Sequence, residues 1–231
     1  MFSTSATRKT FVAAAALSAV VGLSACGSNG TDTAQAADTS SSSSVSVPKP
    51  AAVVPAVPGG TTAVTLDSGF VEALGTLGLT PGTVGGAALD GTTGVVTFPI
   101  TGGTVTLYDR ETGYRPWVQG VLFHEGSGLS LTAGGTMVEL TDFTIDPGKP
   151  ARLFGNVSVN GALAVPSAPL FNLDGSTLKP PTTSADGSAV LDGTTVKLAP
   201  EAAVLLNTTF GTDALAGGLV IGTSTITVQT K

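Results

Sequence analysis

The sequence contains few of the residues that enzyme and metal sites use most. Its 231 residues include one cysteine, one histidine and one tryptophan, and only 11% are charged. A zinc site needs several histidine or cysteine ligands, which one histidine and no available cysteine cannot provide. A catalytic triad would need His124 beside a serine and an acid, but serine is so frequent that proximity in sequence selects none. We therefore predict no catalytic residue, no metal site and no enzymatic activity.

Basic and aromatic residues are also scarce. After Gly59 the chain has 14 acidic and 7 basic residues, a net charge of −7. This balance argues against nucleic acid or anionic lipid as a partner. Aromatic residues make up 5% of the chain, whereas glycine and threonine abound. Such a composition favours turns and β-branched strands over a helical bundle.

The N-terminus lacks a hydrophobic run long enough to cross a membrane. Arg8 and Lys9 precede an uncharged stretch, residues 10–23, while a spanning helix needs about 20 apolar residues. We therefore predict an export signal over residues 1–25. The signal ends in Leu23-Ser24-Ala25-Cys26, which resembles the bacterial lipobox. That resemblance implies cleavage before Cys26 and lipid on its thiol, the alternative being a plain secretory signal with a chance Ala-Cys junction.

Cys26 is the only cysteine, so it has no partner for the disulfide that an oxidising compartment would favour. A lipid on this thiol would hold the protein on the outer face of the cell membrane, and several acyl chains would make the attachment durable. Residues 26–59 continue with serine tract Ser40–Ser44 and then four prolines. We expect this segment to be a disordered tether between the membrane and the domain.

Residues 60–231 have the length and the pattern of a single β-rich domain. Apolar residues alternate with polar ones in several short runs, and Gly-Gly and Asp-Gly pairs separate these runs. One run changes phase, which predicts a β-bulge near Thr141 and Asp142. The class is mostly β (α+β), with a β-sandwich or a curled antiparallel sheet. The expected strands include residues 96–100, 105–107, 129–132, 136–145 and 157–160.

Two segments have helical spacing instead. Leu66, Phe70, Leu74 and Leu77 follow one another at helical intervals around the capping candidates Asp67 and Ser68. A second set follows Pro200-Glu201, where proline suits the first helical turn, and comprises Ala202, Ala203, Leu206 and Phe210. The domain should therefore carry two short amphipathic helices.

The richest segment for chemistry is residues 108–131. Both tyrosines, the only tryptophan and two arginines lie within ten of its residues, namely Tyr108, Arg110, Tyr114, Arg115 and Trp117. Amphipathic rings beside guanidinium groups are typical of binding surfaces. The alternative is a hairpin loop whose rings cover the edge of a sheet.

The same region resembles the HtaA-type domain of actinobacterial haem-uptake proteins. The resemblance rests on the order of a helix, the sequence FPITGG at residues 98–103, the segment GVLFHEGSGLSL at residues 120–131, and a late helix before a glycine-rich strand. It implies a β-rich domain over residues 60–231. In that family a tyrosine on the first helix ligates haem iron, supported by a histidine on a later strand.

His124 matches the family's histidine by position, but the tyrosine position falls at or near Ala73. The expected iron ligand is therefore missing. We expect a cell-envelope lipoprotein whose domain binds a ligand, either haem-related or another small apolar molecule. Tyr114, Trp117 and His124 would line the site, and Arg110 or Arg115 would meet a ligand's carboxylates. The alternatives are a structural or adhesive surface module without a ligand and, third, an envelope hydrolase.

Overall fold

The computed structural model describes residues 46–231, which form one compact unit. The predicted export signal, the predicted lipid site Cys26 and most of the predicted tether lie outside the described residues. The described part is built mainly of strands, with two α-helices, as the sequence predicted. No helix within residues 46–231 is long and apolar enough to cross a membrane.

Thirteen strands form one sheet, and each pair of neighbours is antiparallel. The main path through the sheet is β1-β6-β7-β8-β9-β10-β12-β13-β2-β5-β4, while β3 pairs with β7 and β11 with β12. The strands are β1 (Ala52–Val54), β2 (Gly60–Leu66), β3 (Thr80–Gly85), β4 (Ala88–Asp90), β5 (Val95–Ile100), β6 (Gly102–Leu107), β7 (Val118–Ala133), β8 (Thr136–Asp146), β9 (Arg152–Val159), β10 (Ala162–Asp174), β11 (Thr182–Thr183), β12 (Ala189–Leu198) and β13 (Val220–Val228).

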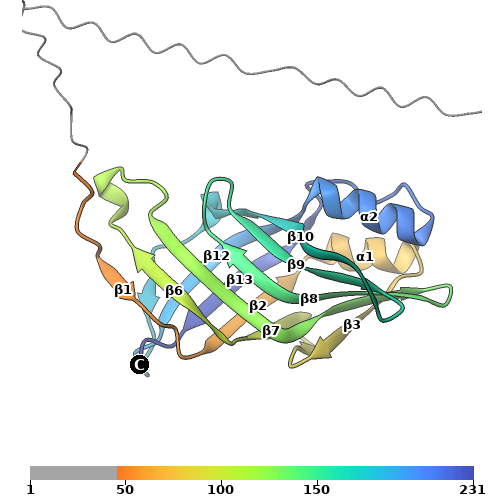
Figure 1. The fold of residues 1–231 in the computed structure, drawn as a ribbon, viewed down its shortest axis with the longest axis horizontal. Coiled ribbons are helices and arrows are strands. Elements are labelled where there is room, and N and C mark those ends of the chain that lie inside the picture. Colours follow the sequence, from red (N-terminus) through yellow and green to blue (C-terminus); the bar gives the residue numbers. More distant parts are fainter. Residues whose placement is uncertain (1–45) are drawn as a thin grey trace, which may run out of the picture. The chain divides into compact units, whose positions relative to one another are not determined.

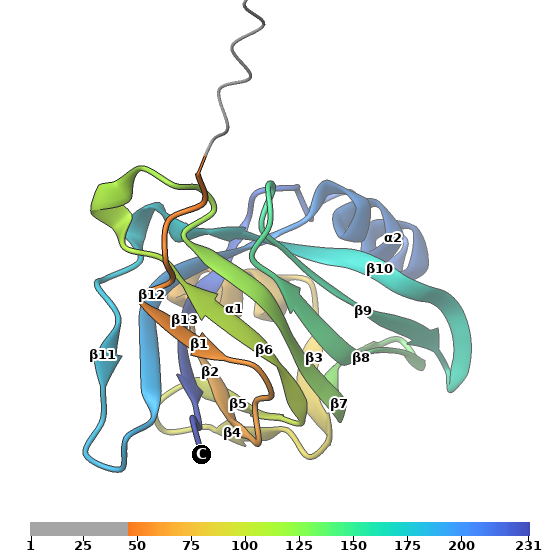
Figure 2. The same ribbon diagram turned by 60° about the vertical axis from the view of Figure 1, so that its left-hand side comes forward.

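The sheet is curled, because the chain joins its two ends directly. β5 lies next to one end of the strand order and β6 next to the other, yet only Thr101 separates them. The bend is helped by Gly103, whose φ is +136° and whose missing Cβ would lie 2.1 Å from the Val121 carbonyl oxygen. Figure 2 shows the strands wrapping around an interior. Of the two predicted forms, the curled sheet is confirmed and the sandwich is not.

The predicted bulge is present in β8. The pairing of β8 with β9 shifts between Thr141 and Thr144, and Asp142 has a φ of +54°. The Asp142 carboxylate accepts hydrogen bonds from the backbone N–H of Gly126 at 2.9 Å and from the Asn156 side chain at 3.1 Å. The bulge keeps both apolar pairs of this strand buried, Val138 with Leu140 and Phe143 with Ile145.

Both predicted helices are confirmed, and both lie at one end of the domain (Figure 1). α1 (Ser68–Thr76) begins after Asp67, whose side chain accepts hydrogen bonds from the backbone N–H groups of Gly69 and Phe70. α2 (Pro200–Phe210) begins with its proline and ends at Gly211, which adopts the left-handed conformation. Their buried faces, which include Leu74 and Leu206, close this end of the core.

The folded domain begins earlier than the predicted boundary at Gly60. β1 pairs with β6, with Val54 opposite Val105, and both Val54 and Val57 are buried in the core. The Val57 N–H also donates a hydrogen bond to the Gly103 carbonyl. Residues 51–58 consist of alanine, valine and proline. This composition suits both an extended tether and an edge strand, so it could not distinguish between them. The sequence gives no sign that this strand has a partner.

Candidate functional site

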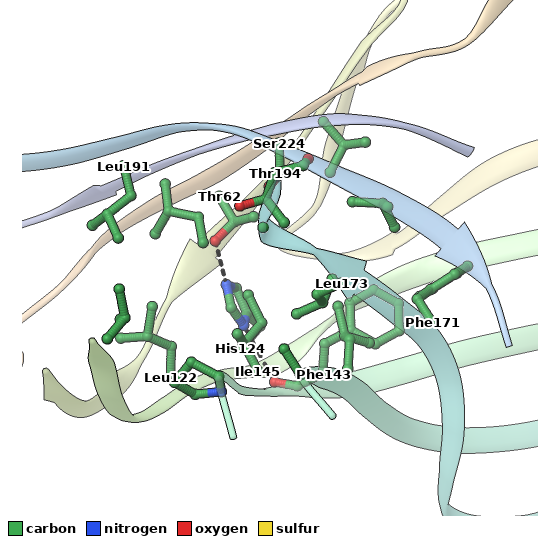
Figure 3. A pocket seen from close by; sticks show the side chains of 18 of the residues that line it. Thr62, Leu122, His124, Phe143, Ile145, Phe171, Leu173, Leu191, Thr194 and Ser224 are labelled. Atoms are coloured by element: carbon green, nitrogen blue, oxygen red, sulfur yellow. Dashed lines mark hydrogen bonds between the residues drawn. The ribbon is translucent and has the colours of Figure 1, made fainter. Parts of the chain in front are cut away.

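The interior of the curled sheet contains a cavity of about 190 Å³. Its wall consists of residues from strands β2, β5, β6, β7, β8, β9, β10, β12 and β13, together with residues from three loops. Nearly all of these side chains are apolar (Figure 3). In β5 they alternate with outward residues, so that Val96 and Phe98 face inward and Thr97 does not.

His124 is the most polar group in the wall, and it is 1% exposed. It lies on β7 between the outward residues Phe123 and Glu125. Its Nε2 atom is 2.8 Å from the Thr62 hydroxyl oxygen on β2, across the interior, and its Nδ1 atom is 3.2 Å from the Phe143 carbonyl oxygen on β8. The histidine thus links three strands of the curled sheet.

These contacts fix the tautomer of His124. A carbonyl oxygen can only accept a hydrogen bond, so Nδ1 carries the proton and donates to Phe143. Nε2 is then an acceptor and receives the hydrogen bond from the Thr62 hydroxyl. Burial lowers the pKa of His124 to about 4, against the smaller raising effect of the Phe143 carbonyl. The imidazole is therefore neutral at neutral pH.

The rest of the wall has little polarity and no charge. Among the described residues that line the cavity, none is Asp, Glu, Lys or Arg. Ser224 on β13 is buried, and its hydroxyl donates to the Thr194 carbonyl on β12 at 3.4 Å. Ser224 and Thr194 are opposite one another in the sheet. Figure 3 shows both near Thr62 and His124, and the remaining polar side chains of the wall are those of Thr104 and Gln119.

The aromatic segment is the loop between β6 and β7, and it reaches the cavity through Trp117. Trp117 and Pro116 are half-buried and line the cavity, as Leu178 does from the loop after β10. The Arg110 guanidinium lies 4.3 Å from the centre of the Trp117 ring. Arg110 also donates a hydrogen bond to the Leu178 carbonyl at 3.2 Å. This arginine therefore connects two loops that are far apart in the strand order.

Of the five predicted binding residues, the structure brings only His124 and Trp117 into the cavity wall. Tyr114 packs instead on Tyr108, with ring centres 4.6 Å apart. Arg115 donates to the carbonyls of Tyr114 and Arg110 within its own loop. Neither arginine lines the cavity, so neither is placed to meet a carboxylate inside it. Their guanidinium groups instead donate to backbone carbonyls of this loop and of the loop after β10.

Thr62 is the residue of the site that the sequence prediction missed. It lies in β2, where Thr62, Val64 and Leu66 line the cavity and Thr61 and Thr65 do not. The alternation could have shown that Thr62 faces inward. Its contact with His124 could not be foreseen, because the two residues are 62 positions apart and meet only when the sheet curls.

The geometry does not support the hydrolase alternative. The hydrogen bonds of the His124 ring go to a threonine and a backbone carbonyl, and in the described part of the chain it bonds to neither a serine side chain nor a carboxylate. A triad needs a carboxylate that orients the histidine as well as a hydroxyl nucleophile beside it, and the backbone carbonyl of Phe143 takes the place of that carboxylate. Nor do residues 46–231 bring three His, Cys, Asp or Glu side chains together as metal ligands.

Haem, which the family resemblance implies, does not fit the residues present. α1 has the sequence SGFVEALGT and contains no tyrosine, and the matching position holds Ala73. Both ring nitrogens of His124 bind protein atoms. Tyr108 and Tyr114 lie outside the cavity wall, and no cation among the described lining residues could pair with a haem carboxylate. The family's iron-ligand set is therefore not reproduced here.

No protein-family model matches the chain, and no curated protein sequence does. Among solved structures, the chain is similar to the C-terminal domain of HtaA from Corynebacterium glutamicum. That match has a TM-score of 0.50 and 14% sequence identity, and covers 75% of this chain and 99% of the other. The heme binding protein HtaB from the same organism matches with a TM-score of 0.47 and 12% identity, covering 78% of this chain and 96% of the other. The likeness to HtaA shows that the domain has the HtaA-type fold, as the sequence resemblance predicted.

Proposed function

We propose that the domain binds a small, mainly apolar molecule in the interior cavity of its curled sheet. The observation that carries this proposal is the cavity itself, about 190 Å³ with an almost wholly apolar wall. Protein cores are close-packed, and few of their voids exceed the size of a water molecule. An engineered apolar cavity of about 150 Å³ stays dry and binds benzene. The cavity of this domain is of the size that holds such a ligand.

A route into the cavity runs between three loops. Half-buried residues line the cavity at this end, and they come from the β6–β7 loop (Pro116 and Trp117), the β8–β9 loop (Pro147 and Ala151) and the loop after β10 (Leu178). The His124 side of the cavity is buried, so the ligand would enter beside Trp117 with its far end near His124. Loops are the mobile parts of such a scaffold, and they can open without disturbing the sheet.

The proposal includes a place for this activity, the outer face of the cell membrane. Its support is the sequence alone: an export signal, a lipobox-like ending at Cys26 and a Ser/Pro-rich tether before the domain. A lipid on Cys26 would keep the binding site at the envelope, where apolar molecules meet the protein as they cross or leave the membrane. The protein would then act as a holder or carrier of its ligand.

Titration with naphthalene tests the binding proposal. The chain carrying Cys26→Ser keeps tether and domain but has no thiol to acylate, so no detergent is needed. Trp117 is the only tryptophan and lines the cavity, so its emission should fall as naphthalene binds. Ile226→Phe, which fills the cavity, should weaken binding at least tenfold (~1.4 kcal/mol). Thr223→Phe, on the outer face of the same strand, is the matched control and should bind as before.

The haem-related alternative has its own readout. Haemin added to the same chain should produce no shifted Soret band, because the described residues lack the family's iron-ligand set. A shifted Soret band that His124→Ala weakens would show that the ligand is haem and not a small apolar molecule. Unchanged Trp117 emission at every naphthalene concentration would reject the cavity as a binding site and favour the structural or adhesive module.

A further inference from the structure

The wall of the cavity selects against charged ligands. No Asp, Glu, Lys or Arg stands among the described residues that line it. An ionised group moved from water into such an environment loses its hydration and gains no counterion. Carboxylic acids and amines would have to bind in their neutral form or leave the charged group in solvent. The ligand that fits the buried end is uncharged.

Three side-chain donors at the buried end of the cavity already have acceptors within the protein. Nδ1 of His124 donates to the Phe143 carbonyl, and the Thr62 hydroxyl donates to Nε2. The Ser224 hydroxyl donates to the Thr194 carbonyl. Each of these side-chain donors is therefore used within the protein.

What these groups offer to a ligand is acceptor capacity. A hydroxyl has one proton and two lone pairs, and the Thr62 oxygen has no other hydrogen bond among the described residues. Thr62 lines the cavity, and the residue is 4% exposed. Thr62 on β2 lies opposite Ile226 on β13. Ser224 is two residues before Ile226 and therefore faces the same side of the sheet. Two hydroxyl oxygens thus present free lone pairs to the same apolar space.

We infer that the ligand is an uncharged, apolar alcohol or phenol whose O–H group donates a hydrogen bond to the Thr62 hydroxyl oxygen. This inference rests on the proposed function and names the chemistry of its ligand. An apolar wall with few acceptor groups binds an apolar skeleton and orients it through a donor on the ligand. A ligand carrying only acceptors, such as an ether or ketone, would leave the Thr62 lone pairs unsatisfied in the cavity.

Matched two-ring compounds test the inference on the full chain carrying Cys26→Ser. The probes are 2-naphthol, 2-methylnaphthalene, which replaces the hydroxyl by a methyl group of similar size, and 2-naphthoate, which carries a charge. Binding is measured by calorimetry and by Trp117 emission. Thr62→Val should weaken 2-naphthol about 2- to 12-fold, the range expected for one neutral hydrogen bond, and should leave 2-methylnaphthalene unchanged or tighter.

Two further variants separate recognition from general damage. Thr62→Ser keeps the hydroxyl and should keep the affinity for 2-naphthol. Thr65→Val makes the same substitution on the outward face of β2 and should change neither compound. If Thr62→Val does not fold, the wild-type affinities still decide. For each compound, the association constant is divided by its partition coefficient from water to hexane. This ratio should be larger for 2-naphthol than for 2-methylnaphthalene.

Each outcome has a distinct meaning. Equal losses of 2-naphthol and 2-methylnaphthalene in Thr62→Val would overturn hydroxyl recognition while the apolar cavity stands. Binding of 2-naphthoate as tight as that of 2-naphthol would also overturn the inference, because the ligand would not need to be uncharged. Failure of all three compounds to bind the wild-type chain would reject the proposed function itself.

Discussion

His124 is 1% exposed, and both of its ring nitrogens have uncharged hydrogen-bond partners. Thr62 and the Phe143 carbonyl satisfy its two ring nitrogens, so the neutral ring is held without strain on either atom. Protonation would place a charge in the apolar interior and would turn Nε2 from an acceptor into a donor. Protonation of His124 should therefore destabilise the folded state.

The pH dependence of stability should show this sensitivity. The pKa of His124 is about 4 in the folded chain and about 6.5 when unfolded. Between these values the unfolded state binds the extra proton, so stability is complete above pH 6.5 and falls as the pH is lowered toward 4. The loss should reach about 3 kcal/mol. Urea unfolding of the wild type and of His124→Gln from pH 7 to pH 4 measures it.

His124→Gln should lack most of this pH-dependent loss, although it is less stable at pH 7. Carboxylates affect stability at lower pH than His124 does. The hydrogen bond from the Gly126 N–H, for example, holds the pKa of Asp142 below its ordinary value. The chain contains no other histidine. Parallel pH profiles for the two proteins would show that the acid response arises elsewhere.

Among individual residues, the sequence predicted His124 and Trp117 but missed Thr62. The first two stand out by rarity, since the chain has one of each. Threonine is common, so nothing in composition separates Thr62 from its neighbours. Arg110 was predicted to meet a ligand's carboxylates but contacts Trp117 and the Leu178 carbonyl, because a guanidinium beside aromatic rings has the same sequence pattern whether it binds a ligand or a loop.

At the scale of elements, the β6–β7 loop is held by Arg110, which contacts both Trp117 and the Leu178 carbonyl. Arg110→Ala should loosen this contact and expose the tryptophan, so acrylamide should quench its emission more strongly. The expected loss of stability is about 1 kcal/mol. Arg115→Ala is the control, because Arg115 contacts only carbonyls of its own loop. Equal quenching in both variants would contradict the role given to Arg110.

Removal of β1 should destabilise the domain, although the strand has only three residues. A chain beginning at Gly60 loses the burial of Val54 and Val57, about 3 kcal/mol or more together, and exposes the edge of β6 to pairing with other chains. Compared with a chain beginning at Ser46, it should unfold at lower urea concentration and aggregate more readily. Identical unfolding midpoints and solubility would show that residues 46–59 are only a tether.

The strands and helices themselves were largely predictable, because alternation and helical spacing are local properties. The bulge at Asp142 was predictable for the same reason: a change of phase within one strand must be absorbed somewhere. The choice between a sandwich and a curled sheet was not, since it depends on which distant strands pair. Only the pairing order shows that β5 and β6, adjacent in sequence, lie near opposite ends of the sheet.

At the scale of the whole molecule, we expect the binding domain to act while attached to the envelope through Cys26. Cys26→Ser in the native host should prevent incorporation of labelled palmitate and move the protein from the membrane fraction into soluble fractions. Ser28→Ala, two residues further on, should have no effect. Retention of the Cys26→Ser protein in the membrane fraction would reject the lipid anchor.

The single-residue link at Thr101 has a consequence for how such a domain can change in evolution. Because only Thr101 separates β5 from β6, this backbone link limits how far the two ends of the sheet can separate. The girth of the container is thus set by the backbone. Binding of a new ligand would then require substitutions of the side chains that line the cavity. Replacement of one large lining residue by a small one would enlarge the cavity at that position.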